Sequence, residues 1–197
     1  MLARALLLLW TAALLGTSAS AADPRGNANL FLGRKVLDSG DWQSVDRQDE
    51  LGVLLSLGRA DWPVFIAVDL LAATDEGDID NDFRGPATLD ARTYEAAFGV
   101  RKIWAPGSTH PYVGAGIVWV TAKVDLTSFG ETFDANDSAL GPWVGGGVFW
   151  RLGRRINLGI DARWSAAEVF LDYGRGLGAD KLKAGGLHGG ITLGAGW

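Results

Sequence analysis

The strongest constraint in this chain is a set of eight segments in which apolar residues occupy every second position. In the last of them, "GGLHGGITLGAGW", Ile191, Leu193 and Trp197 alternate with glycine, threonine and histidine. A period of two is typical of a β-strand with one apolar face. The pattern therefore predicts an all-β fold with eight strands. The segments span 28–37, 50–58, 64–73, 93–104, 112–124, 143–152, 156–170 and 182–197.

The connections between these segments alternate strictly in length. Short turns, "RADWP", "APGSTHP" and "GRR", follow the second, fourth and sixth segments. Longer stretches, such as "DSGDWQSVDRQD" and "TDEGDIDNDFRGPATLDAR", follow the odd-numbered ones. An antiparallel up-and-down barrel with short turns at one end and long loops at the other produces this alternation. We expect residues 22–197 to form one such eight-stranded barrel.

The start of the chain has the layout of a secretory signal peptide. Arg4 precedes an apolar run over 5–15, and Ala19-Ser20-Ala21 forms an A-x-A cleavage site. We expect residues 1–21 to be removed after export through the Sec pathway. No later stretch approaches the length of a membrane-spanning helix, and the sequence has no cysteine for a disulfide or a lipid anchor. The formal net charge of −5 gives no indication of nucleic-acid binding, which requires a basic face.

The two faces of each segment predict which side meets lipid. In 93–104, Phe98 and Val100 lie on an apolar face, whereas the opposite face combines glycine with isolated charges. A face exposed to water would be crowded with lysine, glutamate and threonine, so the glycine-rich face is expected to line a narrow interior. Lys35 is ambiguous because Arg34 lies on the other face of the same segment. The charged residues expected in the interior are Asp69, Glu95, Arg101, Asp161 and Arg163.

An eight-stranded barrel has an interior that side chains just fill. Buried carboxylates and guanidiniums are costly unless they pair with one another. We therefore expect these charges to form a static network that holds the barrel rigid. The alternative is a network that rearranges and opens a narrow path.

The tryptophans sort to the two ends of the predicted strands. Of the nine in the sequence, Trp10 lies in the expected signal peptide. Indole rings prefer the headgroup level of a bilayer, so two girdles of aromatic residues indicate a transmembrane barrel. Those at the short-turn end are Trp62, Trp104, Trp150 and Trp197, and those at or near the long-loop end are Trp42, Trp119, Trp143 and Trp164.

Over residues 22–197 the chain resembles the small OmpA/OmpX-type outer-membrane β-barrels of Gram-negative bacteria. The resemblance lies in the "HPYVGAG" and "GIDARWS" runs and in the terminal aromatic residue. It implies an outer-membrane location, with short periplasmic turns and long extracellular loops. It also implies that Trp197 is read by the outer-membrane assembly machinery. The resemblance is specific for architecture and not for activity.

One acidic stretch, "TDEGDIDNDFRG", places Asp78, Asp80 and Asp82 at alternate positions, as in an EF-hand loop. Phe83 stands where that loop requires glycine, and Leu89 stands where it requires glutamate. We therefore expect no metal site. We expect instead a solvated acidic loop, loosely bridged by divalent ions to lipopolysaccharide phosphates.

Enzymes that modify lipid A exist among such barrels, and the deacylase type resembles this chain in fold. That type uses neighbouring serine and histidine residues oriented by an acid. The matching stretch here, "DARWSAAE", offers Ser165 and Glu168 without a histidine. Only His110 and His188 exist, and both are expected to be structural. A triad assembled across strands stays open, but we expect no catalytic residue and no cofactor.

The sequence thus predicts a non-enzymatic outer-membrane barrel with a structural or surface-interaction role through its extracellular acidic loops. The expected partners are outer-membrane lipid, lipopolysaccharide and the assembly machinery, with an unidentified surface partner. The first alternative is passage of a small or hydrophobic solute through a narrow or lateral opening. A lipid A-modifying enzyme is the second alternative.

Overall fold

The structure is a computed structural model that describes residues 23–81, 85–128, 131–172 and 179–197. The expected signal peptide and Asp82 lie outside these residues. Two short helical segments, α2 (Ser39–Trp42) and η1 (Gln43–Val45), follow the first strand. The strands are β1 (Pro24–Val36), β2 (Arg47–Arg59), β3 (Phe65–Asn81), β4 (Gly85–Ile103), β5 (Thr109–Ser128), β6 (Glu131–Leu152), β7 (Ile156–Ser165), β8 (Glu168–Asp172), β9 (Ala179–Lys183) and β10 (Leu187–Gly196).

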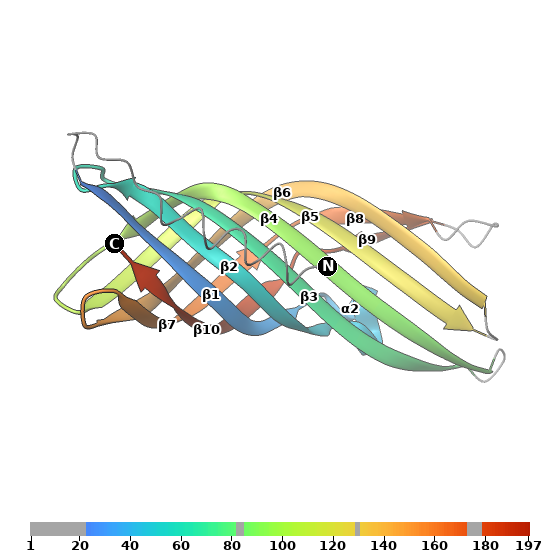
Figure 1. Ribbon diagram of the computed structural model, residues 1–197. Helices are drawn as coiled ribbons and strands as arrows, with labels where there is room; N and C mark the ends of the chain where they lie inside the picture. Colours follow the sequence, from blue (N-terminus) through green and yellow to red (C-terminus); the bar gives the residue numbers. More distant parts are fainter. Residues whose placement is uncertain (1–22, 82–84, 129–130, 173–178) are drawn as a thin grey trace.

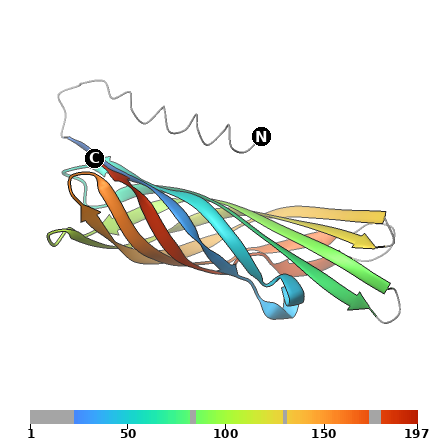
Figure 2. The same cartoon turned by 60° about the horizontal axis from the view of Figure 1, so that its bottom comes forward.

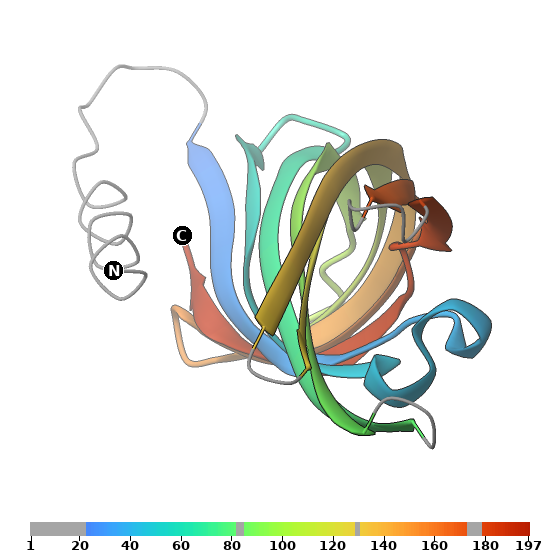
Figure 3. The same cartoon turned by 90° about the vertical axis from the view of Figure 1, so that its right-hand side faces the viewer.

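Eight of these strands form a closed antiparallel barrel in the order β1-β10-β7-β6-β5-β4-β3-β2 (Figures 1 and 3). The first and last strands close the ring, with Ala28 opposite Ala195. Backbone hydrogen bonds between Gly26 and Trp197, of 3.0 and 3.1 Å, continue this pairing at the short-turn end. The predicted fold class, an eight-stranded antiparallel barrel, is confirmed.

Four strands extend well past the long-loop ends that the sequence pattern predicted. β3 and β4 stay paired out to Asn81 opposite Gly85, and β5 and β6 out to Ser128 opposite Glu131. Their outer neighbours stop earlier, because β2 pairs with β3 only up to Thr74, and β7 pairs with β6 only from Trp143. These stretches, expected as loops, therefore form a sheet that projects beyond the barrel rim (Figure 2).

The segments expected over 156–170 and 182–197 are also corrected. β7 ends at Ser165 and β10 begins at Leu187, and between them β8 and β9 form a separate two-stranded hairpin. The apolar alternation continues into β8, where Val169 and Leu171 are buried at the long-loop end of the hydrophobic core. The prediction of a strand from the period of two is therefore correct for β8, but β8 does not belong to the barrel.

The projecting sheet, the β8–β9 hairpin and the α2–η1 segment together form what we call the cap, at the long-loop end (Figure 3). Side chains join its parts. The Trp42 indole N–H donates to the carbonyl of Lys183 at 2.8 Å, and the Phe170 N–H donates to Asp137 at 2.8 Å. The interior of the cap is a hydrophobic core that includes Leu37, Trp42, Val45, Ala91, Val120, Ala122, Val124, Ala135, Ala167, Val169, Leu171 and Ala184.

The outer face of the barrel is an apolar belt. Leu32, Phe98, Ile117, Ile160 and Leu193 are among its exposed side chains. No helix in the described part of the chain is long and apolar enough to span a membrane. Tryptophans exposed on the outside of the molecule are Trp62, Trp104, Trp119, Trp150, Trp164 and Trp197.

Two tryptophans differ from the girdle expectation, because Trp42 and Trp143 point inward. Trp42 is part of the cap core, and Trp143 is only 3% exposed. A side chain on Gly114 would approach the Trp143 ring to 3.0 Å, so this glycine leaves room for the indole inside the barrel. The Trp143 indole N–H lies 3.3 Å from the carbonyl oxygen of Phe98. The position of Trp143 near a strand end predicted a girdle residue, but its side chain lies on the inner face.

Candidate functional site: the polar interior of the barrel

The middle of the barrel holds a set of paired charges that we call the central cluster. Arg101 on β4 and Arg163 on β7 both donate to Oδ2 of Asp69 on β3, at 2.8 and 3.0 Å. Arg163 also contacts Asp161 at 3.4 Å, and the Tyr112 hydroxyl donates to Asp161 at 2.6 Å. All five side chains are buried. Two guanidiniums thus face two carboxylates, which balances the charge inside the barrel.

Aromatic rings complete the surroundings of both arginines. The guanidinium carbon of Arg101 lies 5.2 Å from the centre of the Tyr112 ring, and that of Arg163 lies 5.4 Å from the Trp143 ring. Cation–π contact of this kind stabilises a guanidinium that has left water. The inward position of Trp143 is therefore part of how the barrel holds Arg163.

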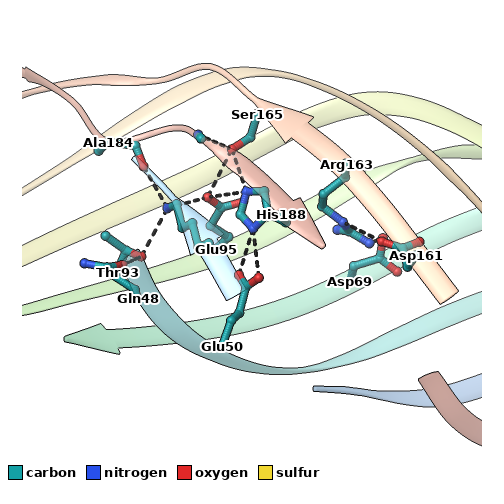
Figure 4. Close-up of polar contacts among 12 residues, drawn as sticks. Gln48, Glu50, Asp69, Thr93, Glu95, Asp161, Arg163, Ser165, Ala184 and His188 are labelled. Carbon is teal, nitrogen blue, oxygen red and sulfur yellow. Dashed lines mark hydrogen bonds and ion pairs between the residues drawn. The ribbon is translucent and has the colours of Figure 1, made fainter. Parts of the chain in front are cut away.

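A second group, the histidine cluster, lies closer to the cap (Figure 4). Its cation is Lys35 on β1, which donates to Glu95 at 2.8 Å and to Thr93 at 3.1 Å on β4. The same ammonium donates to the carbonyl of Ala184 at 2.8 Å, in the connection between the hairpin and β10. Thr93 in turn donates to Gln48 at 2.7 Å. Lys35 therefore links β1, β4 and the base of the cap.

The rest of the histidine cluster is centred on His188 of β10. Its Nδ1 lies 2.9 and 3.0 Å from the two oxygens of Glu50, and its Nε2 lies 3.1 Å from the Ser165 hydroxyl. Ser165 donates to Glu95 at 3.1 Å and accepts from the Gly186 N–H at 3.3 Å. A serine, a histidine and a carboxylate thus lie in sequence, as they do in hydrolase triads.

The hydrogen bonds favour a structural role for this arrangement. The Ser165 hydroxyl donates to Glu95 and accepts from the Gly186 N–H, while the His188 ring lies between Ser165 and Glu50. A serine hydroxyl whose proton goes to a carboxylate is not activated as a nucleophile by the neighbouring histidine. Both side chains are also at most 1% exposed.

A third group fills the interior at the short-turn end. Arg151 donates to Asn27 at 2.9 Å and to Asn157 at 3.3 Å, and Asn157 donates to Asn27 at 3.0 Å. Beside them, the ring of His110 stacks on Phe149 with centroids 4.8 Å apart. The barrel interior therefore carries three successive groups of packed polar side chains.

The structure places all five of the charged residues expected in the interior inside the barrel. Asp69, Arg101, Asp161 and Arg163 meet in the central cluster, whereas Glu95 belongs to the histidine cluster. Sequence reasoning missed Lys35 and Glu50 and the contacts of His188 with Ser165 and Glu50. Arg34, the neighbour of Lys35, pairs with Asp49 on the outer face at 3.0 Å, and this pairing places Lys35 on the inner face. The pairing can be recognised only once the strand register is known.

Several buried polar atoms in the interior have no hydrogen-bond partner among the described residues. They are Nε2 of Gln48, Oδ1 of Asp69, Nε of Arg101 and Nη1 of Arg163. Unpartnered buried atoms of this kind are commonly satisfied by internal water.

The acidic stretch that resembles an EF-hand loop is part of the projecting sheet. The backbone of Asp78 pairs with Thr88, and that of Asp80 with Pro86, in the β3–β4 ladder. At these two positions the backbone is extended, and Asp82 and Phe83 lie outside the described residues. Among the described residues, no group of three or more histidine, cysteine or acidic side chains is placed to hold a metal ion.

No family model matches the sequence, and no curated protein matches it. Solved structures do share its fold. The outer membrane protein OprG from Pseudomonas aeruginosa matches with 17% identity and a TM-score of 0.57, over 88% of this chain and 94% of that one. Neisserial surface protein A matches with 15% identity and a TM-score of 0.54, over 88% and 95%.

A third similar structure is Ail, the attachment invasion locus protein of Yersinia pestis, solved with the heparin analogue sucrose octasulfate. It is 12% identical, with a TM-score of 0.56 over 89% of this chain and 99% of that one. At these identities the likeness establishes architecture and not activity. The chain has the eight-stranded barrel fold of the small outer-membrane proteins of the OmpA/OmpX type.

Proposed function

We propose that this chain is a non-enzymatic integral outer-membrane protein whose closed barrel anchors an extracellular surface for interactions. The apolar belt and the exposed tryptophans at its two ends support insertion in a bilayer. The short-turn end then faces the periplasm and the cap faces outward. Trp197, at the end of β10, is the residue proposed to be read by the assembly machinery.

The observation that carries this proposal is the filled interior. The central and histidine clusters span opposite walls of the barrel with paired charges, and the apolar core of the cap lies beyond them. Moving an ion through this interior requires charge pairs to separate in a medium of low dielectric constant, which is costly. A filled barrel suits an anchor better than a pore.

The cap is the part of the molecule that can meet partners outside the membrane. Its sheet and connections carry many carboxylates, including Asp75, Glu76, Asp134, Asp137 and Glu168. Lipopolysaccharide phosphates carry the same sign of charge, so contact with them requires bridging divalent cations. We propose this bridged contact as the first interaction of the cap, alongside a protein or host surface partner. Nucleic acid is not a partner in this proposal, because the cap is acidic.

A second candidate function, passage of a small solute, is favoured by one observation. Gln48, Asp69, Arg101 and Arg163 each leave a buried polar atom without a partner among the described residues, and internal water commonly satisfies such atoms. A hydrated interior could carry a small solute if the cap moved aside.

Single-channel recording in planar bilayers separates the two functions. We expect the full chain, purified from outer membranes, to show no stable conductance steps. We expect none to appear when Arg163 is changed to Gln, because the aromatic and apolar filling remains. Reproducible steps whose size changes in Arg163→Gln, with no change in the exposed control Lys123→Gln, would favour passage and contradict the closed-anchor proposal.

A further inference from the structure

The periplasmic end of the barrel gathers arginines that have no carboxylate partner. Cations in the cap and on the outer wall are mostly paired, as in Arg34–Asp49 and Lys183–Asp38. In contrast, Arg25, Arg151, Arg154 and Arg155 form no ion pair with any described carboxylate. The acidic side chains at this end are Asp23 and Asp61, and Asp61 lies 3.5 Å from Arg59.

The barrel closure brings these four arginines to one place, which we call the closing seam. Gly26, next to Arg25, exchanges two backbone hydrogen bonds with Trp197. The Gly196 N–H donates to the carbonyl of Arg155 at 2.7 Å, which fixes the β6–β7 turn against the end of β10. A side chain on Gly196 would meet Nη2 of Arg151 at 2.4 Å, so Arg151 passes directly beside this glycine.

The arginines of the closing seam differ in their exposure to solvent. Arg151 is held inside the barrel by Asn27 and Asn157. Arg25, Arg154 and Arg155 are exposed to solvent. Their turn is tight, because Gly153 adopts a positive φ of 65° that places the two following arginines at the tip. Arg25 and Arg151 also act on each other as like charges.

Apolar side chains lie immediately beside this positive rim. Leu152, Ile156, Leu193 and Trp197 are exposed on the outer face at the same end. Ile156 is paired with Leu152 on one side and with Ala195 on the other. A ligand that fits this surface carries a negative head beside hydrocarbon chains.

We propose that the closing seam binds an anionic phospholipid of the periplasmic leaflet. Arg25, Arg154 and Arg155 contact the phosphate, because guanidinium groups match phosphate oxygens in charge and geometry. The acyl chains lie on Trp197 and Ile156. This inference rests on the membrane location proposed above and assigns a lipid class and a site to it. Lipopolysaccharide fits this end poorly, because it occupies the opposite leaflet, beside the acidic cap.

The test is native mass spectrometry of the full chain in nanodiscs that contain equal amounts of phosphatidylglycerol and phosphatidylcholine. We expect wild type to retain phosphatidylglycerol preferentially. Each cationic side chain near an anionic membrane surface changes affinity roughly fivefold, so Arg154→Gln/Arg155→Gln should lower the preference by roughly 25-fold. The matched control, Arg47→Gln/Lys123→Gln, removes two cations at the cap end and should retain the wild-type preference.

Three outcomes would overturn the inference: no preference in wild type, an equal loss in both double variants, or retention of added lipopolysaccharide at the seam in place of phosphatidylglycerol. Failure of the membrane proposal looks different. In that case the chain would not insert into vesicles of either lipid, and its gel mobility would not shift on boiling. Insertion without a lipid preference would therefore contradict only the lipid site.

Discussion

The ammonium of Lys35 donates a 2.8 Å hydrogen bond to the carboxylate of Glu95 across the interior of the barrel. Lys35 lies on β1 and Glu95 on β4, and two strands, β2 and β3, separate them around the ring. Both side chains are almost completely buried. The pair therefore joins opposite walls of the barrel, and removing either partner leaves a buried charge unbalanced.

Changing Lys35 to Met should destabilise the folded barrel by about 3–5 kcal/mol, because Glu95 keeps its charge without its nearest cation. The double variant Lys35→Met/Glu95→Gln should recover much of this loss. Urea unfolding in detergent, followed by tryptophan fluorescence, measures both. If the double variant is as unstable as the sum of the two single variants, the two side chains do not act as a pair.

Removing the charge of Asp69 should be far more harmful than removing that of Asp49. Asp69 binds Arg101 and Arg163 inside the barrel, so Asp69→Asn should cost about 3–5 kcal/mol. Asp49 pairs with Arg34 on the outer face with both side chains mostly exposed, so Asp49→Asn should cost at most about 1 kcal/mol. The same unfolding measurement compares them, and equal losses would contradict the buried network.

The contact between Asp38 and Lys183 joins the α2 segment to β9 at 2.8 Å and should depend on pH. The hydrogen bond from Lys183, followed by that from the Gly40 N–H, lowers the pKa of Asp38 below 3.8. The hydrogen bond to Asp38 raises the pKa of Lys183 above 10.5. The contribution of Asp38 is therefore complete above pH 3.8 and lost as pH falls through its lowered pKa. That of Lys183 is complete below pH 10.5 and lost as pH rises through its raised pKa.

Carbon-13 NMR of the Asp38 carboxyl group checks this directly. We expect a titration midpoint below 3.8 that moves back toward that value in Lys183→Met. Lys181→Met is the control, since Lys181 pairs with Glu168 and not with Asp38. A midpoint that Lys183→Met leaves unchanged would show that the ammonium is not the main cause of the lowered pKa.

The opposite orientations of Trp143 and Trp164 predict different access to lipid. Trp143 is inside the barrel beside Arg163, whereas Trp164, in the adjacent strand, is exposed on the outer face. Brominated lipids quench the fluorescence of indoles that touch acyl chains. Trp164→Phe should therefore remove part of the quenchable signal, while Trp143→Phe should remove unquenched signal only. The reverse result would place Trp143 in the girdle after all.

Replacing Trp197 by Ala should lower the amount of folded protein in the outer membrane. Its side chain lies on the outside at the end of β10, and its backbone is already paired with Gly26, so the substitution leaves the barrel pairing intact. A heat-modifiability gel of the outer-membrane fraction measures the effect. Trp150→Ala, which removes another exposed tryptophan, is the control. Equal loss in both variants would indicate a general girdle effect and not an assembly signal.

The sequence was sufficient to predict the barrel because its period of two follows directly from strand geometry. It could not predict the ends of the strands. Beyond Thr74 and Thr121 the residues become polar and acidic, which is typical of loops. The projecting sheet nevertheless continues there, with one buried face of small apolar side chains that includes Ala91 and Val124. Local composition does not reveal this buried face, because the residues that cover it come from α2 and from the β8–β9 hairpin.

Some residues of the interior were predictable from the sequence, but their contacts were not. Glu95 and Asp161 could be assigned to the inner face from alternation within one strand. Which cation each would meet depends on how strands far apart in the sequence are placed around the ring, and that register is invisible in one sequence. The contact of His188 with Glu50, between β10 and β2, is the clearest example.

The composition of the cap core restricts the order in which parts of the molecule can fold. Val45 comes from an early part of the chain, whereas Val169, Leu171 and Ala184 come from the segment just before the last strand. The early residues of this core can be buried only after the late ones have been added to the chain. The cap can therefore reach its final form only when the segment that leads into the closing strand is available.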